Sequence, residues 1–131
     1  MPALYSDILL DHFRHPRNYG SLDAPDISNE QFNPLCGDRI RIELRLAPSI
    51  VTDARVVAEV RFKGDACAIC TAAASLLTEM VLSEDVEALA NISDAQLISA
   101  LESDIKPARI QCALLPLQAL HEGVRNYNTE H

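Results

Sequence analysis

Four cysteines and one aspartate are the residues of this chain best suited to metal or sulfur chemistry. Thiolates bind soft and borderline metals, and they also accept sulfur as persulfides. Three of the cysteines fall at expected element boundaries, where helix starts favour the thiolate. Asp38 offers a fourth, harder ligand, and the preceding Gly37 lets the turn bend so that neighbouring side chains converge. The pattern predicts a metal cage whose candidate ligands are Cys36, Asp38, Cys67 and Cys112.

Each candidate ligand also has a purely structural interpretation. A free cysteine is often a small buried hydrophobic residue, and an aspartate in a turn often accepts hydrogen bonds from backbone amides. The cysteine spacings match no single zinc-finger pattern. Cys70 lies three residues after Cys67, on the same face of a helix start. Three roles are open for it: a packed core residue, an auxiliary ligand or resolving thiol, or one half of a redox dithiol. A thioredoxin-like motif requires a βαβ pattern, which the expected antiparallel strands do not supply.

The periodicity of the first half predicts one helix, one loop and a small sheet. Residues 4–13 carry apolar side chains at helical spacing, whereas residues 16–36 show no periodicity and are expected to form an extended loop. Strict alternation over residues 39–46 and 55–63 predicts two antiparallel strands, with Val56 and Ala58 on the buried face of the second. Residues 50–54 form either a third short strand or the start of the second.

The second half of the chain is expected to be helical. A wide apolar stripe predicts a central buried helix that ends near Ser83, and residues 86–90 form a small helix. A capping box opens a helix over residues 93–101, and a last helix begins at Ile110 and frays after Tyr127. The element order predicts an α+β fold in a single domain over residues 1–131, with helices packed on one face of a small antiparallel β-sheet of two to three strands.

Composition excludes several classes of protein. The chain has 131 residues, 48% of them hydrophobic, which suits one compact core. Its 11 basic and 19 acidic residues give a net charge of −8, which disfavours nucleic-acid binding. Neither a membrane-spanning run nor a secretory leader is expected, so we predict a cytoplasmic protein with reduced thiols.

Other charged residues receive less specific predictions. His12 and His15 lie near the end of the first helix, where helix capping is favoured over metal ligation. His121 is expected to pack or to lie on the surface. One strand face is rich in arginine and is expected to be solvated or to meet an acidic partner; it carries Arg39, Arg41, Arg45, Arg55 and Arg61.

Several segments, in order and over nearly the whole chain, resemble the IscU, NifU N-terminal and SufU family of iron–sulfur assembly proteins. The most specific are Asp11–Gly20 and Asn33–Asp38; the others are Cys67–Ile69, Ser75–Glu79 and Arg109–Ala113. The resemblance implies an IscU/SufU-like fold. It also implies that the ligands of a transient [2Fe–2S] cluster or of Zn(II) are Cys36, Asp38, Cys67 and Cys112.

The resemblance further implies a scaffold and sulfur acceptor, without enzymatic turnover, that receives persulfide sulfur from a cysteine desulfurase. Its other partners would be apo iron–sulfur acceptor proteins. We expect Cys112 to accept the persulfide, because a helix N-terminus activates a thiol. Asp38, as the weakest ligand, would keep the site labile. The alternatives are a SufU-like zinc-dependent sulfurtransferase partner of the desulfurase and a purely structural zinc-binding domain.

Two departures bear on the branch of the family. Gln111 stands where IscU-type scaffolds carry a histidine, and residues 105–109 keep one proline of the stretch that a dedicated Hsp70 chaperone recognises, so that partner is not expected. Arg109 resembles the SufU pattern, whereas the spacing from Cys67 to Cys112 is IscU-like. The sequence therefore combines features of both branches.

Overall fold

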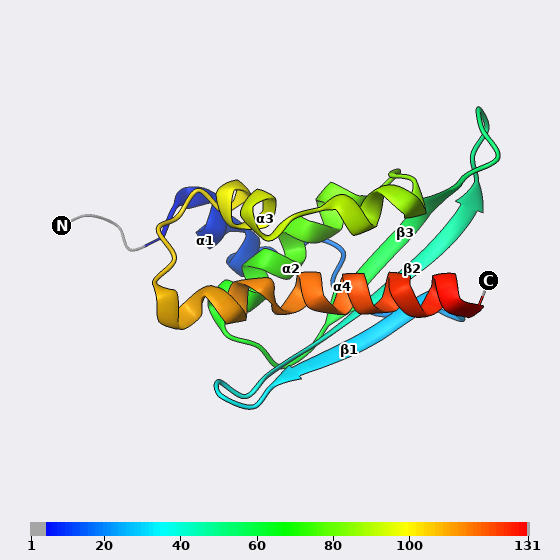
Figure 1. Ribbon diagram of the computed structural model, residues 1–131. Helices are drawn as coiled ribbons and strands as arrows, with labels where there is room; N and C mark the ends of the chain where they lie inside the picture. Colours follow the sequence, from blue (N-terminus) through cyan, green and yellow to red (C-terminus); the bar gives the residue numbers. More distant parts are fainter. Residues whose placement is uncertain (1–4, 131) are drawn as a thin grey trace.

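The computed structural model describes residues 5–130, which form a three-stranded antiparallel sheet with helices on one face (Figure 1). The strands lie in the order β1 (Ile27–Asn33), β2 (Asp38–Pro48) and β3 (Arg55–Lys63). The helices are α1 (Asp7–Arg14), α2 (Ala68–Val81), α3 (Asp94–Ala100) and α4 (Ile110–Glu130), with short 3₁₀ helices η1 (Val86–Asn91) and η2 (Pro107–Arg109). The predicted α+β class and the predicted layering are confirmed.

The core lies between the inner face of the sheet and the helices α2 and α4. The alternation of β2 places Ile40, Ile42 and Leu44 under the helices, each at most 2% exposed. Full burial of each such side chain contributes about 1.5–3 kcal/mol relative to exposure. Gly123 lets α4 approach β1 closely, because a Cβ there would lie 2.8 Å from the Ile27 side chain. This packing holds α4 against β1.

The prediction of a loop over residues 16–36 is wrong for its second half, which forms β1. Of the inward-facing side chains only Ile27 is apolar and buried, while Asn29 and Gln31 are half-buried polar residues. The strand therefore lacks the apolar alternation by which a strand is recognised. The first half of the segment is irregular and lies along β3, where Gly20 N–H donates to the Phe62 carbonyl.

A β-bulge changes which residues of β3 face the core, so the predicted alternation is wrong for Val56 and Ala58. Arg45 pairs with Glu59 and Leu46 pairs with Val57, so the register shifts by one residue between them. Val57 is consequently buried and Ala58 exposed, the reverse of the simple alternation. Residues 50–54 form neither a third strand nor part of β3, but an exposed hairpin loop.

The helix predictions are confirmed with shifted ends. α1 begins at Asp7 after the N-cap Ser6, and the predicted start at Leu4 lies outside the described residues. The capping box of α3 is present, and α2 ends at Val81. α4 does not fray after Tyr127 but continues to Glu130. Within the part of the chain that the structure describes, no helix has the length and apolar character needed to cross a membrane.

His12 is a buried hydrogen-bonding residue, not the helix cap that we predicted. The residue is 5% exposed, and its side chain lies between α1 and α2. Nδ1 lies 2.7 Å from the Ser75 hydroxyl, and Nε2 lies 3.3 Å from a Glu79 carboxylate oxygen. Ser75 also accepts a hydrogen bond from the Arg17 backbone N–H at 2.8 Å. The imidazole therefore joins α1 to α2, and the Ser75 hydroxyl joins the following loop to α2.

The unfolding free energy is expected to fall as the pH decreases from about 7 toward 5, partly because of His12. Burial, followed by the charge of Arg17, lowers the pKa of His12 in the folded protein. The unfolded chain then binds more protons than the folded chain just below the normal histidine pKa, so stability decreases with acidification. A His12→Gln variant should lose this part of the dependence in denaturant titrations. An exposed-histidine control, His15→Gln, should keep it, and an unchanged slope in His12→Gln would contradict the prediction.

Candidate metal and sulfur site

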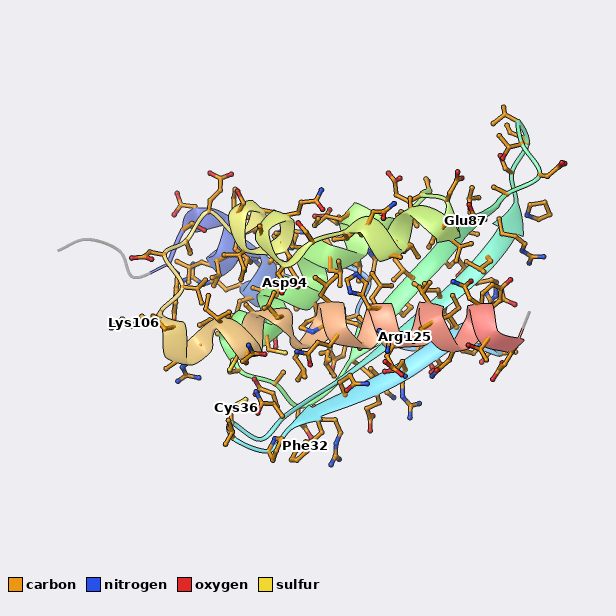
Figure 2. The ribbon with its side chains drawn as sticks, in the orientation of Figure 1. Phe32, Cys36, Glu87, Asp94, Lys106 and Arg125 are labelled. Atoms are coloured by element: carbon orange, nitrogen blue, oxygen red, sulfur yellow. The ribbon has the colours of Figure 1, made fainter. Side chains whose placement is uncertain are left out.

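Cys36 lies in the turn between β1 and β2, which its neighbours fold tightly. The Asn33 side chain accepts a hydrogen bond from Leu35 N–H at 3.0 Å, and the Asn33 carbonyl accepts one from Gly37 N–H at 2.8 Å. Gly37 has a φ of 76°, a left-handed conformation that glycine adopts without steric cost. The turn presents Cys36 at an exposed position at one end of the sheet (Figure 2).

Asp38, the first residue of β2, is buried and has one unpaired carboxylate oxygen. The residue is only 4% exposed. Oδ1 accepts a hydrogen bond from Cys67 N–H at 2.9 Å, whereas Oδ2 is buried with no hydrogen-bond partner within residues 5–130. A buried carboxylate oxygen left unpaired is unfavourable. A cation coordinated by Oδ2 would remove that penalty, so the carboxylate fits a metal ligand.

Cys67 is the N-cap of α2, and Gly64 allows that helix to start beside β2. A Cβ at Gly64 would lie 2.0 Å from the Arg39 carbonyl oxygen, so the backbones approach at a distance that other residues do not permit. The Cys67 sulfur accepts a hydrogen bond from Cys70 N–H at 3.4 Å. The amide and the sulfur of Cys67 thus contact Asp38 and the first turn of α2 respectively.

Cys70 is fully buried in the core, and this favours the packing interpretation for its side chain. Burial, reinforced by the nearby Asp38 carboxylate, raises the pKa of the Cys70 thiol. A buried thiol that stays protonated is a poor nucleophile.

Cys112 completes the cluster from α4. It is the third residue of that helix and 2% exposed, and its sulfur lies 3.4 Å from the Cys36 sulfur. One ligand atom from each of Cys36, Asp38 and Cys112 lies within 4.8 Å of the other two. Cys67 falls outside this group of three, although its amide contacts Asp38. Three of the four predicted ligands are therefore side by side, and the fourth is adjacent to them.

The electrostatics of Cys112 differ from our prediction. Burial first, and then the hydrogen bond with Cys36, raise the pKa of Cys112 to about 12. The helix start and the hydrogen bond to Arg109 favour the thiolate but do not outweigh these effects. In turn, the contact with Cys112 raises the pKa of Arg109. A cation bound between the sulfurs reverses this balance, because metal coordination deprotonates thiols.

A cavity of about 400 Å³ gives access to the two close thiols. It opens between the β1–β2 turn and the start of α4, and Leu35 at its rim is 93% exposed. Leu35 was not among the predicted site residues, although it is a large apolar residue between a proline and a cysteine in a turn. The cavity is lined by Asn33, Leu35, Cys36, Ala108, Arg109, Gln111 and Cys112.

Comparison with protein families finds one model that matches nearly the whole chain. The model is described as the NifU-like N-terminal domain, and it matches residues 4–131. The zinc-dependent sulfurtransferase SufU of Bacillus subtilis is 36% identical, over 95% of this chain and 91% of SufU. The iron–sulfur cluster assembly scaffold protein IscU of Azotobacter vinelandii is 32% identical, over 94% of this chain and 93% of IscU.

A solved structure shares the fold. The crystal structure of a nitrogen-fixing NifU-like protein (N-terminal) from Brucella abortus superposes with a TM-score of 0.76, and the match covers 98% of this chain and 96% of that one. The sequence identity is 18%, so this likeness concerns the arrangement of the elements.

Proposed function

Because this chain belongs to the family of NifU-like N-terminal domains, we propose that it is an iron–sulfur cluster assembly scaffold and sulfur acceptor. In this role it receives sulfur from a cysteine desulfurase and passes a transient [2Fe–2S] cluster to apo iron–sulfur acceptor proteins. The cluster, or a metal ion, is its cargo. The proposed ligands are Cys36, Asp38, Cys67 and Cys112.

The observation that carries the proposal is the convergence of Cys36, Asp38 and Cys112, whose ligand atoms lie within 4.8 Å of one another, together with the buried, unpaired carboxylate oxygen of Asp38. Two sulfurs 3.4 Å apart and one buried oxygen form a mixed soft and hard donor set. Thiolate sulfur suits iron and zinc better than carboxylate oxygen does, so Asp38 is the ligand most readily displaced. A site with one exchangeable ligand suits a protein that must release what it assembles.

The proposed sulfur acceptor is Cys112, which lines the cavity. Because burial favours the protonated Cys112 thiol, its thiolate would form when a cation binds between the two sulfurs. That thiolate would then attack the terminal sulfur of the desulfurase persulfide, forming a new S–S bond on Cys112 while the S–S bond of the donor breaks. The donor cysteine leaves as a thiolate, and no net oxidation occurs. Arg109, whose contact with Cys112 favours the thiolate, is positioned to balance the negative charge of the attacking sulfur.

The second candidate function is that of a zinc-dependent sulfurtransferase partner of the desulfurase. The observation that favours it is the 36% identity to SufU, which bears that name. In this case the same donor set would hold Zn(II), whose sulfur and oxygen ligands match those present. A closed structural zinc site is less favoured, because Cys36 is exposed beside a cavity of about 400 Å³ that Cys112 also lines.

Metal content distinguishes the two candidates. We expect anaerobic reconstitution with iron and sulfide to produce a chromophore in the visible range if the chain is a scaffold, and colourless zinc-loaded protein if it is a sulfurtransferase partner. Elemental analysis of the purified protein accompanies the spectra. A Cys36→Ser variant, which lacks one exposed thiol, is the matched control and should retain less metal. Folded wild-type protein that binds neither iron nor zinc would contradict both candidates.

A further inference from the structure

The outer face of the sheet concentrates positive charge in an otherwise acidic chain. Although the net charge is −8, strands β2 and β3 hold six of the 11 basic residues. Three of the six gather at the Cys36 end of the sheet, together with two exposed aromatic residues. We call this group the basic sheet face; it consists of Tyr19, Phe32, Arg39, Arg41 and Lys63.

The strand register places Phe32, Arg39, Arg41 and Lys63 on one surface, and Tyr19 lies beside the edge strand β3, where its ring contacts Phe62. Arg39 lies opposite Phe32 on β1, and Arg41 lies opposite Lys63 on β3. The Arg39 guanidinium lies 5.2 Å from the centre of the Phe32 ring. Tyr19 lies beside Arg41 and Lys63 around a hollow of about 430 Å³. Because Ile40 and Ile42 point into the core, the residues alternating with them face away from the helices.

The cations of this face have few strong partners within the chain. Arg39 and Arg41 share one carboxylate, Glu30, at 3.8 and 3.7 Å, beyond good hydrogen-bond length. Arg41 also lies 4.0 Å from Glu43. Lys63 forms no ion pair among the described residues. Most of the guanidinium N–H donors are therefore free to bind further carboxylates.

We propose that the basic sheet face binds an acidic segment of a partner protein, beside the thiol cavity but separate from it. Tyr19 and Phe32 are 56% and 50% exposed, and exposed aromatic residues with arginines are the composition of protein-binding surfaces. Carboxylates of the partner would pair with the cations, while its apolar side chains would cover the rings.

The charges of the face favour an acidic protein over a nucleic acid. Glu30 and Asp65 also line the hollow, and both would repel a continuous run of phosphates. A protein segment carries separate carboxylates that can avoid them. The face and Cys36 lie at the same end of the sheet, as the labels of Phe32 and Cys36 show in Figure 2. The hollow of the basic sheet face and the thiol cavity share no lining residue.

The test is an NMR titration of the ¹⁵N-labelled chain with an oligoglutamate peptide. We expect amide shifts to concentrate around the basic sheet face and to vanish at about 0.5 M salt, where exposed charges are screened. The triple variant Arg39→Gln, Arg41→Gln, Lys63→Gln should bind about tenfold more weakly. The matched control, Arg14→Gln, Arg55→Gln, Arg125→Gln, removes the same charge elsewhere and should bind like the wild type.

Several results would overturn the proposal. If both triple variants bind the peptide equally weakly, net charge attracts the peptide and no defined site exists. If the amide shifts centre on another surface, the peptide binds there and not at the basic sheet face. An oligothymidylate that binds this face more tightly than oligoglutamate would identify a phosphate site. The single variant Lys63→Gln, at an exposed side chain, guards against loss of fold and should still weaken binding. None of these measurements depends on metal or on the proposed scaffold function.

Discussion

Replacing Cys112 with serine is expected to abolish desulfurase-dependent persulfide formation on the chain. Cys36 and Cys112 both line the open cavity, with their sulfurs 3.4 Å apart, and the Cys112 thiol contacts Arg109. A serine hydroxyl ionises far less readily than a thiol and offers no comparable nucleophile. Mass spectrometry after incubation with a desulfurase and cysteine should show the added sulfur on wild-type protein and none on the variant.

The matched control is Cys70→Ser, which also removes one thiol near a helix start. Because Cys70 is fully buried, an unpaired hydroxyl there should lower the unfolding free energy by roughly 1–3 kcal/mol. Persulfide labelling should remain close to that of the wild type. Persulfide found on Cys70, or a normal yield without Cys112, would contradict the assignment.

Local periodicity explains why much of the fold could be predicted. The alternation of β2, the apolar stripe of α2 and the capping box of α3 each follow from interactions between near neighbours in sequence. The site could also be anticipated, because Cys36, Cys67 and Cys112 stand at the ends of such elements. Element boundaries are where a small α+β fold brings distant residues together.

The errors arise where distant packing overrides the local pattern. The strand β1 is stabilised by hydrogen bonding with β2 and by packing against α4, and it has few apolar residues of its own. The β3 bulge depends on the partner strand, so the sequence of β3 alone could not indicate that Val57 is buried. The pKa of Cys112 was predicted from the helix start, but burial and the neighbouring Cys36 thiol determine it. These three errors therefore come from contacts between residues distant in sequence.

Replacing Asp38 with asparagine is expected to lower Zn(II) affinity at least about tenfold while preserving the fold. The asparagine side-chain oxygen can still accept the hydrogen bond from Cys67 N–H that Asp38 Oδ1 accepts at 2.9 Å. The substitution removes the negative charge and the buried, unpaired Oδ2, which is the atom we assign to the metal. Competition with a chromophoric chelator measures the affinity, and thermal unfolding of the metal-free protein checks the fold.

Asp65→Asn provides the matched control for the loss of charge. Asp65 is exposed in the connection between β3 and α2, and its backbone carbonyl, not its carboxylate, accepts the hydrogen bond from Arg39 N–H at 2.8 Å. Because that carboxylate is not among the proposed ligands, we expect its variant to bind Zn(II) like the wild type. Equal affinities in wild type and Asp38→Asn would show that Asp38 serves only as an acceptor for the backbone of Cys67. A loss shared by both variants would attribute the effect to net charge, whereas a loss confined to Asp38→Asn would establish the carboxylate as a ligand.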